Sequence, residues 1–164
     1  DIAEEMLAFL GDSEIIAHNA PFDFGFLDAE LVRAGRPRLD RARMVDSLDM
    51  HDESRQRVLA ACCTASEELI VVTHGTDTMA ETAAVLGQAF NAGTAALIGK
   101  RIVLTGAMVP YSVSDSDALF NLGSAVMASQ LVAPGVYIAM NGRCFPWDRV
   151  RKNRALGVFE GEAL

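Results

Sequence analysis

Apolar and polar positions along the chain form blocks that predict strands and helices in turn. Short apolar runs rich in β-branched residues predict buried strands at 14–17, 69–72, 102–105 and 136–140. Apolar residues at helical spacing predict helices over 2–10, 21–33, 52–63, 78–90 and 118–131. Strands that alternate with helices of this length are typical of parallel βαβ units. We therefore expect an α/β fold of three layers, αβα, with a mostly parallel, Rossmann-like sheet.

The length of the chain, 164 residues, suits one domain with a real core, because about half of its residues are apolar. The proline-containing, basic stretch 36–43 is the best candidate for a linker. We expect residues 46–164 to form an α/β domain. Residues 1–45 should form a helix–strand–helix segment that packs into the same domain.

Charge and cysteine content narrow the range of functions. A net charge of −8 argues weakly against general nucleic-acid binding. The uncharged stretches 82–99 and 118–142 are long enough to span a membrane. Glycine, asparagine, glutamine or proline interrupts both stretches, so they predict buried helices with turns and strands instead. The three cysteines form no CxxC pair, which favours a reducing cytoplasm. We expect no membrane association.

The stretch 68–81 has the order of a site in an α/β protein. A buried strand ends at the polar turn Thr73-His74-Gly75-Thr76-Asp77, and a helix follows at once, with Thr78 and Glu81 in the pattern of a capping box. Free N–H groups at such a helix start, at the carboxyl edge of the sheet, favour anionic ligands. From spacing alone, Thr76 and Asp77 could also be a plain helix cap.

Three motifs in this part of the chain occur in a known order: Asp46–Met50, Thr73–Met79 and Lys100–Met108. Residues 46 to about 160 therefore resemble the amino-terminal domain of bacterial L-asparaginases and, more closely, short single-domain asparaginase-like proteins. The resemblance implies an amidohydrolase that converts L-asparagine to L-aspartate and ammonia. It also implies a small-molecule amide substrate, a homo-oligomer and no cofactor.

The resemblance assigns roles to particular residues. The relay of a threonine, an aspartate and a lysine falls on Thr76, Asp77 and Lys100, while Ser47, Asp77 and Gly75 would bind the substrate. Lys100 can act as the base only if burial or a nearby charge favours its neutral form. Without the motif, Lys100 could equally be a solvated lysine at the start of a strand. For His74 we expect a structural role.

One part of the family pattern is missing. Asparaginases open with a strand that ends in a Gly-Gly-Thr turn, whose threonine is the primary nucleophile, and this turn is absent upstream of Ser47. Gly93-Thr94 lies in the wrong place to replace it. We therefore expect weak or no catalysis by this chain.

The segment before Ser47 resembles another family. The block His18-Asn19-Ala20-Pro-Phe22-Asp23 is similar to DnaQ-like 3′–5′ exonucleases of the DNA polymerase III epsilon type. Under this alternative Asp23 would help to hold Mg²⁺ or Mn²⁺ on a nucleic-acid substrate, but the other carboxylates of that family are absent. The two resemblances meet at Val45–Leu48, so we hypothesise a chimera or a fragment. A third possibility is a non-catalytic domain.

Two features near the end of the chain have simpler interpretations. The basic stretch 149–154 reads as a solvated tail in an acidic chain, although it could bind anions. Phe145 and Trp147, in a predicted loop, could mark a contact between subunits, with local packing as the alternative.

Overall fold

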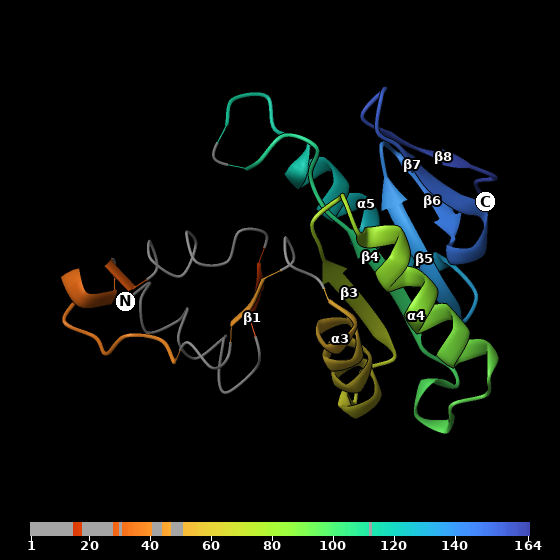
Figure 1. Ribbon diagram of the computed structural model, residues 1–164, viewed down its shortest axis with the longest axis horizontal. Coiled ribbons are helices and arrows are strands. Elements are labelled where there is room, and N and C mark those ends of the chain that lie inside the picture. The colour runs from red at the N-terminus through yellow and green to blue at the C-terminus, as the bar shows by residue number, and fades with distance from the viewer. Residues whose placement is uncertain (1–14, 18–27, 30, 41–43, 47–50, 112) are drawn as a thin grey trace. The chain divides into compact units, whose positions relative to one another are not determined.

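The computed structural model describes residues 15–17, 28–29, 31–40, 44–46, 51–111 and 113–164, and the chain divides into two compact units, Asp1–Asp49 and Met50–Leu164 (Figure 1). In the first unit, β1 (Ile15–Ala17) pairs in parallel with β2 (Met44–Asp46). This confirms the strand predicted near residue 15. The helix predicted over 2–10 lies outside the described residues, and the packing of residues 1–45 into the same domain stays a prediction.

The second unit contains the predicted alternation of helices and strands. Its elements are α3 (Asp52–Thr64), β3 (Leu69–Thr73), α4 (Met79–Asn91), η2 (Ala95–Leu97), β4 (Arg101–Thr105), α5 (Ala118–Leu131), β5 (Gly135–Met140), β6 (Arg143–Pro146), η3 (Trp147–Arg149), β7 (Val150–Asn153) and β8 (Val158–Gly161). Four strands form a sheet in the order β3-β4-β5-β6, parallel except for β6. The α/β fold with a mostly parallel sheet is thereby confirmed.

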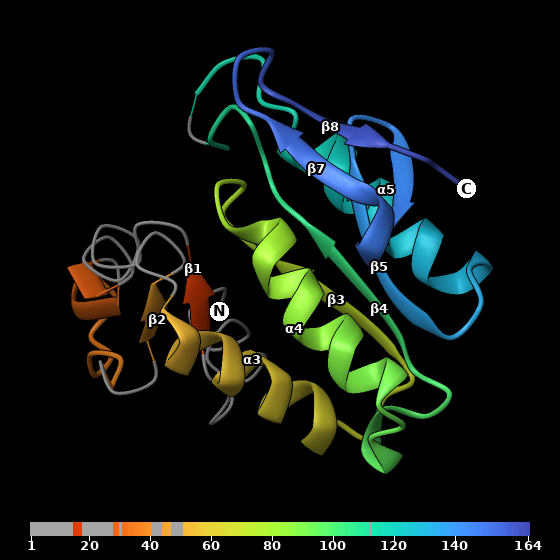
Figure 2. The ribbon, with the colours of Figure 1, turned by 45° about the vertical axis from the view of Figure 1, so that its right-hand side comes forward.

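Helices cover both faces of this sheet. Figure 2 shows α3 and α4 on one face and α5 on the other, the three layers expected from the sequence. Every residue of β5 is buried, as its apolar run predicts. Within α5 only Asn121, Ala125 and Ser129 are buried, a narrow stripe at i, i+4 spacing. No helix in the described part of the chain is long and apolar enough to cross a membrane.

The end of the chain differs from the sequence interpretation. Residues predicted as a loop and a solvated tail form β6 and the antiparallel β7–β8 hairpin. Phe145 is fully buried, so the prediction that it contacts another subunit is wrong. The ring of Trp147 packs against Gly87 of α4, where an added Cβ would lie 2.2 Å from the indole.

The capping box predicted at the start of α4 is also absent. Thr78 occupies the N-cap position but makes no side-chain capping hydrogen bond. Its hydroxyl oxygen is buried without a hydrogen-bond partner among the described residues. The backbone at Thr78 has φ −122° and ψ 16°, outside the extended conformation that capping side chains normally need.

Candidate active site

The polar turn after β3 is held against the end of β4. The His74 backbone N–H donates to the Thr105 carbonyl over 2.8 Å. The two backbones approach so closely that a Cβ on Gly106 would lie 2.2 Å from the His74 carbonyl oxygen. Only glycine avoids that clash, so Gly106 fixes the place of the turn.

The His74 side chain joins this turn to α4. Its ring is buried, with Nδ1 2.7 Å from the Gly75 carbonyl oxygen and Nε2 2.9 Å from the Thr82 hydroxyl. A carbonyl can only accept, so Nδ1 carries the proton and, in the neutral ring, Nε2 accepts from Thr82. This arrangement is the structural role that we expected of His74.

Thr76 and Asp77 meet a lysine from the far end of the sequence. The Lys152 amine donates to the Thr76 hydroxyl oxygen over 2.8 Å and to Asp77 Oδ1 over 2.6 Å. The Lys152 side chain is only 11% exposed, whereas that of Asp77 is 63% exposed. The Lys152 amine thus bonds to a buried hydroxyl, that of Thr76, and to a solvent-exposed carboxylate, that of Asp77.

The surroundings of this cluster are electropositive. The Arg154 guanidinium donates to the Asp77 carbonyl over 3.2 Å. Thr76 and Asp77 lie just before the start of α4, whose first amide groups carry partial positive charge. Lys152 at the Asp77 carboxylate, Arg154 at the Asp77 backbone carbonyl and the helix start place positive charge beside this turn, which suits a ligand with an anionic group.

The structure does not bring Lys100 to Thr76 and Asp77. Lys100 precedes β4, at the amino edge of the sheet, and the turn follows β3 at the carboxyl edge. Its amine donates to the backbone carbonyls of Ala65 and Glu67, 3.2 Å away in the case of Glu67. These bonds satisfy a buried ammonium group and link the α3–β3 loop to β4.

The other predicted site residues divide between the two parts of the chain. Gly75 lies buried inside the turn, where its carbonyl faces the His74 ring. Ser47 and Asp23 lie outside the described residues. Sequence reasoning missed Lys152 because its segment looked like a solvated basic tail. The available signal was that Lys152 and Lys100 are the only two lysines in the chain.

The loop after β4 begins at Gly106, beside the His74 backbone, and is held by Asp117. The Asp117 carboxylate accepts the Met108 and Val109 N–H groups over 3.1 and 3.0 Å, and the Asn121 amide over 2.7 Å. Burial opposes the ionised form, but these hydrogen bonds outweigh it and hold the pKa of Asp117 below its usual value. Asp117 is therefore a charged anchor for this loop.

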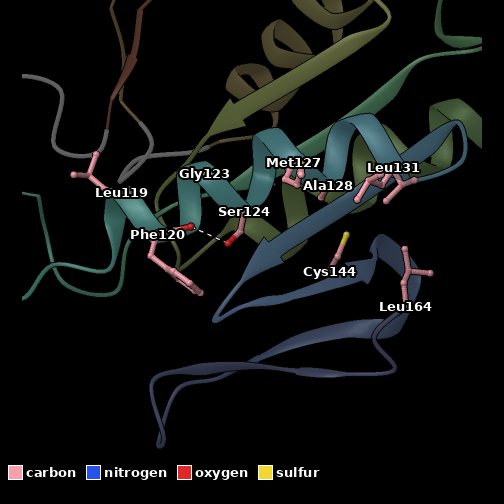
Figure 3. Close-up of a pocket in the computed structure, with 10 residues that line it drawn as sticks. Leu119, Phe120, Gly123, Ser124, Met127, Ala128, Leu131, Cys144 and Leu164 are labelled. Atoms are coloured by element: carbon pink, nitrogen blue, oxygen red, sulfur yellow. Dashed lines mark hydrogen bonds between the residues drawn. The ribbon is translucent and has the colours of Figure 1, made fainter.

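An apolar groove lies along α5, away from the polar cluster. It has a volume of about 740 Å³. Figure 3 shows Leu119, Phe120, Met127 and Leu131 of α5 along it, with Cys144 and Leu164 opposite. Its lining contains no charged side chain. Within the described residues, no group of three or more His, Cys, Asp or Glu side chains could hold a metal ion.

The fold and the cluster together define the chain as an α/β domain with a hydroxyl, a carboxylate and an amine gathered beside a helix start, as in enzymes that use a hydroxyl nucleophile. Residues 9–159 match the family described as "Asparaginase, N-terminal". The chain belongs to this family.

Individual relatives agree with the family assignment. The chain is 35% identical over 120 residues to the probable periplasmic L-asparaginase of Haemophilus influenzae, covering 70% of this chain and 32% of that protein. Among solved structures, the thermostable L-asparaginase from Thermococcus kodakarensis has a TM-score of 0.60 and 31% identity, over 82% of this chain and 43% of that one. The probable cytoplasmic L-asparaginase from Campylobacter jejuni also has a TM-score of 0.60, with 30% identity over 72% of this chain and 38% of that one. The chain thus spans well under half the length of each of these relatives.

Proposed function

We propose that this chain carries the threonine–aspartate–lysine part of an L-asparaginase-type active site, made of Thr76, Asp77 and Lys152. The substrate would be a small amide such as L-asparagine, hydrolysed to L-aspartate and ammonia. The observation that carries the proposal is the Lys152 amine in contact with both the Thr76 hydroxyl and the Asp77 carboxylate. In this proposal Lys152 takes the role that the sequence motif assigned to Lys100.

The geometry suggests how the cluster would work. In the arrangement seen, an amine 2.6 Å from a carboxylate is protonated, so Lys152 donates to Thr76 and cannot accept its proton. A substrate ammonium group would compete with Lys152 for the exposed Asp77 carboxylate. With its ion pair to Asp77 replaced, Lys152 would pass its proton to solvent water, and the neutral amine would then take the proton of the Thr76 hydroxyl as general base. The family resemblance also assigns substrate contacts to Ser47 and Gly75, and both roles stay predictions.

We expect the chain alone to be weak or inactive, because it lacks the Gly-Gly-Thr turn that supplies the primary nucleophile in the family. The test therefore needs two measurements. Ammonia release from L-asparagine reports catalysis, and calorimetric titration with L-aspartate reports whether the site binds the product. Thr76→Val and Asp77→Asn should lower both signals, while Thr94→Val, in the other Gly-Thr pair, should change neither. A wild-type chain that shows no hydrolysis and also no L-aspartate binding would contradict the proposal.

We also propose that the chain self-associates through the apolar groove of α5. Several apolar side chains along the groove face solvent, among them Leu131 at 76% and Met127 at 57% exposure. Exposed apolar side chains along one helix face are typical of the core of an interface between subunits. Residues 118–142 carry no charge in a chain of net charge −8, so two copies can meet here without like-charge repulsion. Met127→Glu should shift the sedimentation coefficient to that of a monomer, and an unchanged oligomer would contradict this interface.

The remaining sequence hypotheses differ in their support. A cytoplasmic location is consistent with three free cysteines and with a relative described as cytoplasmic. The exonuclease alternative gains no support, since the asparaginase family match already includes the segment that contains Asp23. The chimera hypothesis stays a prediction, which amplification of genomic DNA across codons 40–55 tests directly.

A further inference from the structure

We infer that Asn141 is a positioning residue, whose side chain holds the β7–β8 hairpin so that Lys152 reaches Thr76 and Asp77. The inference rests on the proposed function, because positioning Lys152 matters only if that lysine serves the site. The bonds that carry it run from the turn after β5 to the hairpin and do not include the reacting groups.

The Asn141 side chain bonds directly to the strand opposite Lys152. Its Oδ1 accepts the Phe159 backbone N–H over 3.2 Å. Phe159 lies directly across the hairpin from Lys152 in the antiparallel register. The hydrogen bond therefore ties Phe159, the residue paired with Lys152, to the turn that follows β5.

Asn141 is in turn tied to the loop after β4. Its backbone N–H donates to Asn121 Oδ1 over 3.2 Å. The fully buried Asn121 amide group donates to the Gly106 carbonyl over 3.0 Å and to the Asp117 carboxylate over 2.7 Å. One continuous set of hydrogen bonds thus joins the loop after β4 to the hairpin that carries the amine.

The backbone at Asn141 explains why an asparagine suits this position. Asn141–Gly142 forms the two-residue connection between β5 and β6, with φ of 55° and 70°. Asparagine tolerates this left-handed conformation better than most residues, and glycine tolerates it fully. The side chain is thus separable from the turn: Asn141→Gly keeps the backbone conformation and removes the acceptor, whereas Asn141→Asp keeps an acceptor at the same place.

Lys152 and Arg154 bond to the site itself, whereas the side-chain bonds between β7 and β8 are internal and do not set the position of the hairpin on the sheet. Arg151 and Asn153 of β7 both bond to the Glu160 carboxylate of β8, over 2.9 and 3.2 Å. They hold the two strands together, so the hairpin should persist as a unit in Asn141→Gly. What that variant should lose is one of the bonds that dock the hairpin, and with it part of the protection of Lys152.

The two lysines of the chain make the experiment specific. Brief acetylation with an N-hydroxysuccinimide ester, followed by peptide mass spectrometry, gives the reaction rates of Lys152 and Lys100 in the same sample. Asn141→Gly should raise the rate at Lys152 roughly fivefold relative to Lys100, since loss of one ordinary hydrogen bond changes a local opening equilibrium by about that factor. Asn141→Asp should restore the wild-type ratio.

Three results would overturn the inference. The first is an unchanged ratio of the Lys152 to the Lys100 acetylation rate in Asn141→Gly. The second is an equal rise in the rates of both lysines, which would indicate general loosening of the fold. The third is failure of Asn141→Asp to restore the protection of Lys152. Because acetylation reads the position of Lys152 without any turnover, this experiment is separable from the proposed function. A raised ratio together with no L-aspartate binding would retain the positioning role and reject the site.

Discussion

Replacing Lys152 by methionine removes the amine from the candidate site while keeping most of the aliphatic stem. The change should destabilise the second unit by about 3 kcal/mol. The ion pair contributes at most about 1 kcal/mol of this, because the Asp77 carboxylate is 63% exposed and screened by solvent. The larger part, about 2 kcal/mol, comes from the buried Thr76 hydroxyl, which loses a hydrogen bond to a charged donor.

Arg151→Met is the matched control for Lys152→Met. Arg151 lies next to Lys152 on β7 and contacts the Glu160 carboxylate at 2.7 Å, but its side chain is 81% exposed. Its loss should cost about 0.5 kcal/mol or less. Urea unfolding followed by tryptophan fluorescence measures both variants, since Trp147 is the only tryptophan and lies in the second unit. Equal costs for the two variants would refute the claim that burial at Thr76 makes the difference.

Two further predictions use other parts of the second unit. Gly87→Ala should destabilise the second unit by about 2 kcal/mol, because the new methyl would lie 2.2 Å from the Trp147 ring. Gly123→Ala has open space at its Cβ and should stabilise the unit by up to about 1 kcal/mol. Similar effects of the two variants in urea unfolding would contradict this packing. Burial raises the pKa of Cys62 from 9.0 to about 11, so the stabilisation by its neutral thiol is complete below pH 9 and is lost as the pH rises through about 11. The loss should reach about 3 kcal/mol in the wild type and be absent in Cys62→Ala, and parallel pH profiles of unfolding free energy would exclude it.

The sequence predicted the elements that carry a continuous apolar run or an apolar helical period. The apolar runs that became β3, β4 and β5 were found within one residue of their ends. The two inner strands, β4 and β5, are covered on both faces and need apolar side chains throughout, whereas β3 lies at the edge of the sheet and is only partly buried. The helix boundaries of α3 and α4 were equally close. In these elements the local pattern and the tertiary environment demand the same residues.

The sequence did not predict the elements that depend on distant partners. β7 contains Arg151, Lys152 and Asn153, a polar run that forms a strand because it pairs with β8 and carries an ion pair to it. No period of apolar residues marks such a strand. Likewise, the bond from Lys152 to Thr76 joins residues 76 positions apart, and no spacing rule applies at that separation.

The choice between the two lysines follows from the direction of the strands. In a parallel sheet all carboxyl ends lie at one edge, and the five-residue strand between Lys100 and that edge is roughly 16 Å long, farther than a lysine side chain extends. A partner for Thr76 must therefore come from beyond the carboxyl end of a strand or from a segment that folds back over that edge. The β7–β8 hairpin is such a segment. Since Lys100 and Lys152 are the only lysines of the chain, the topology alone selects Lys152 for any lysine-dependent chemistry at Thr76.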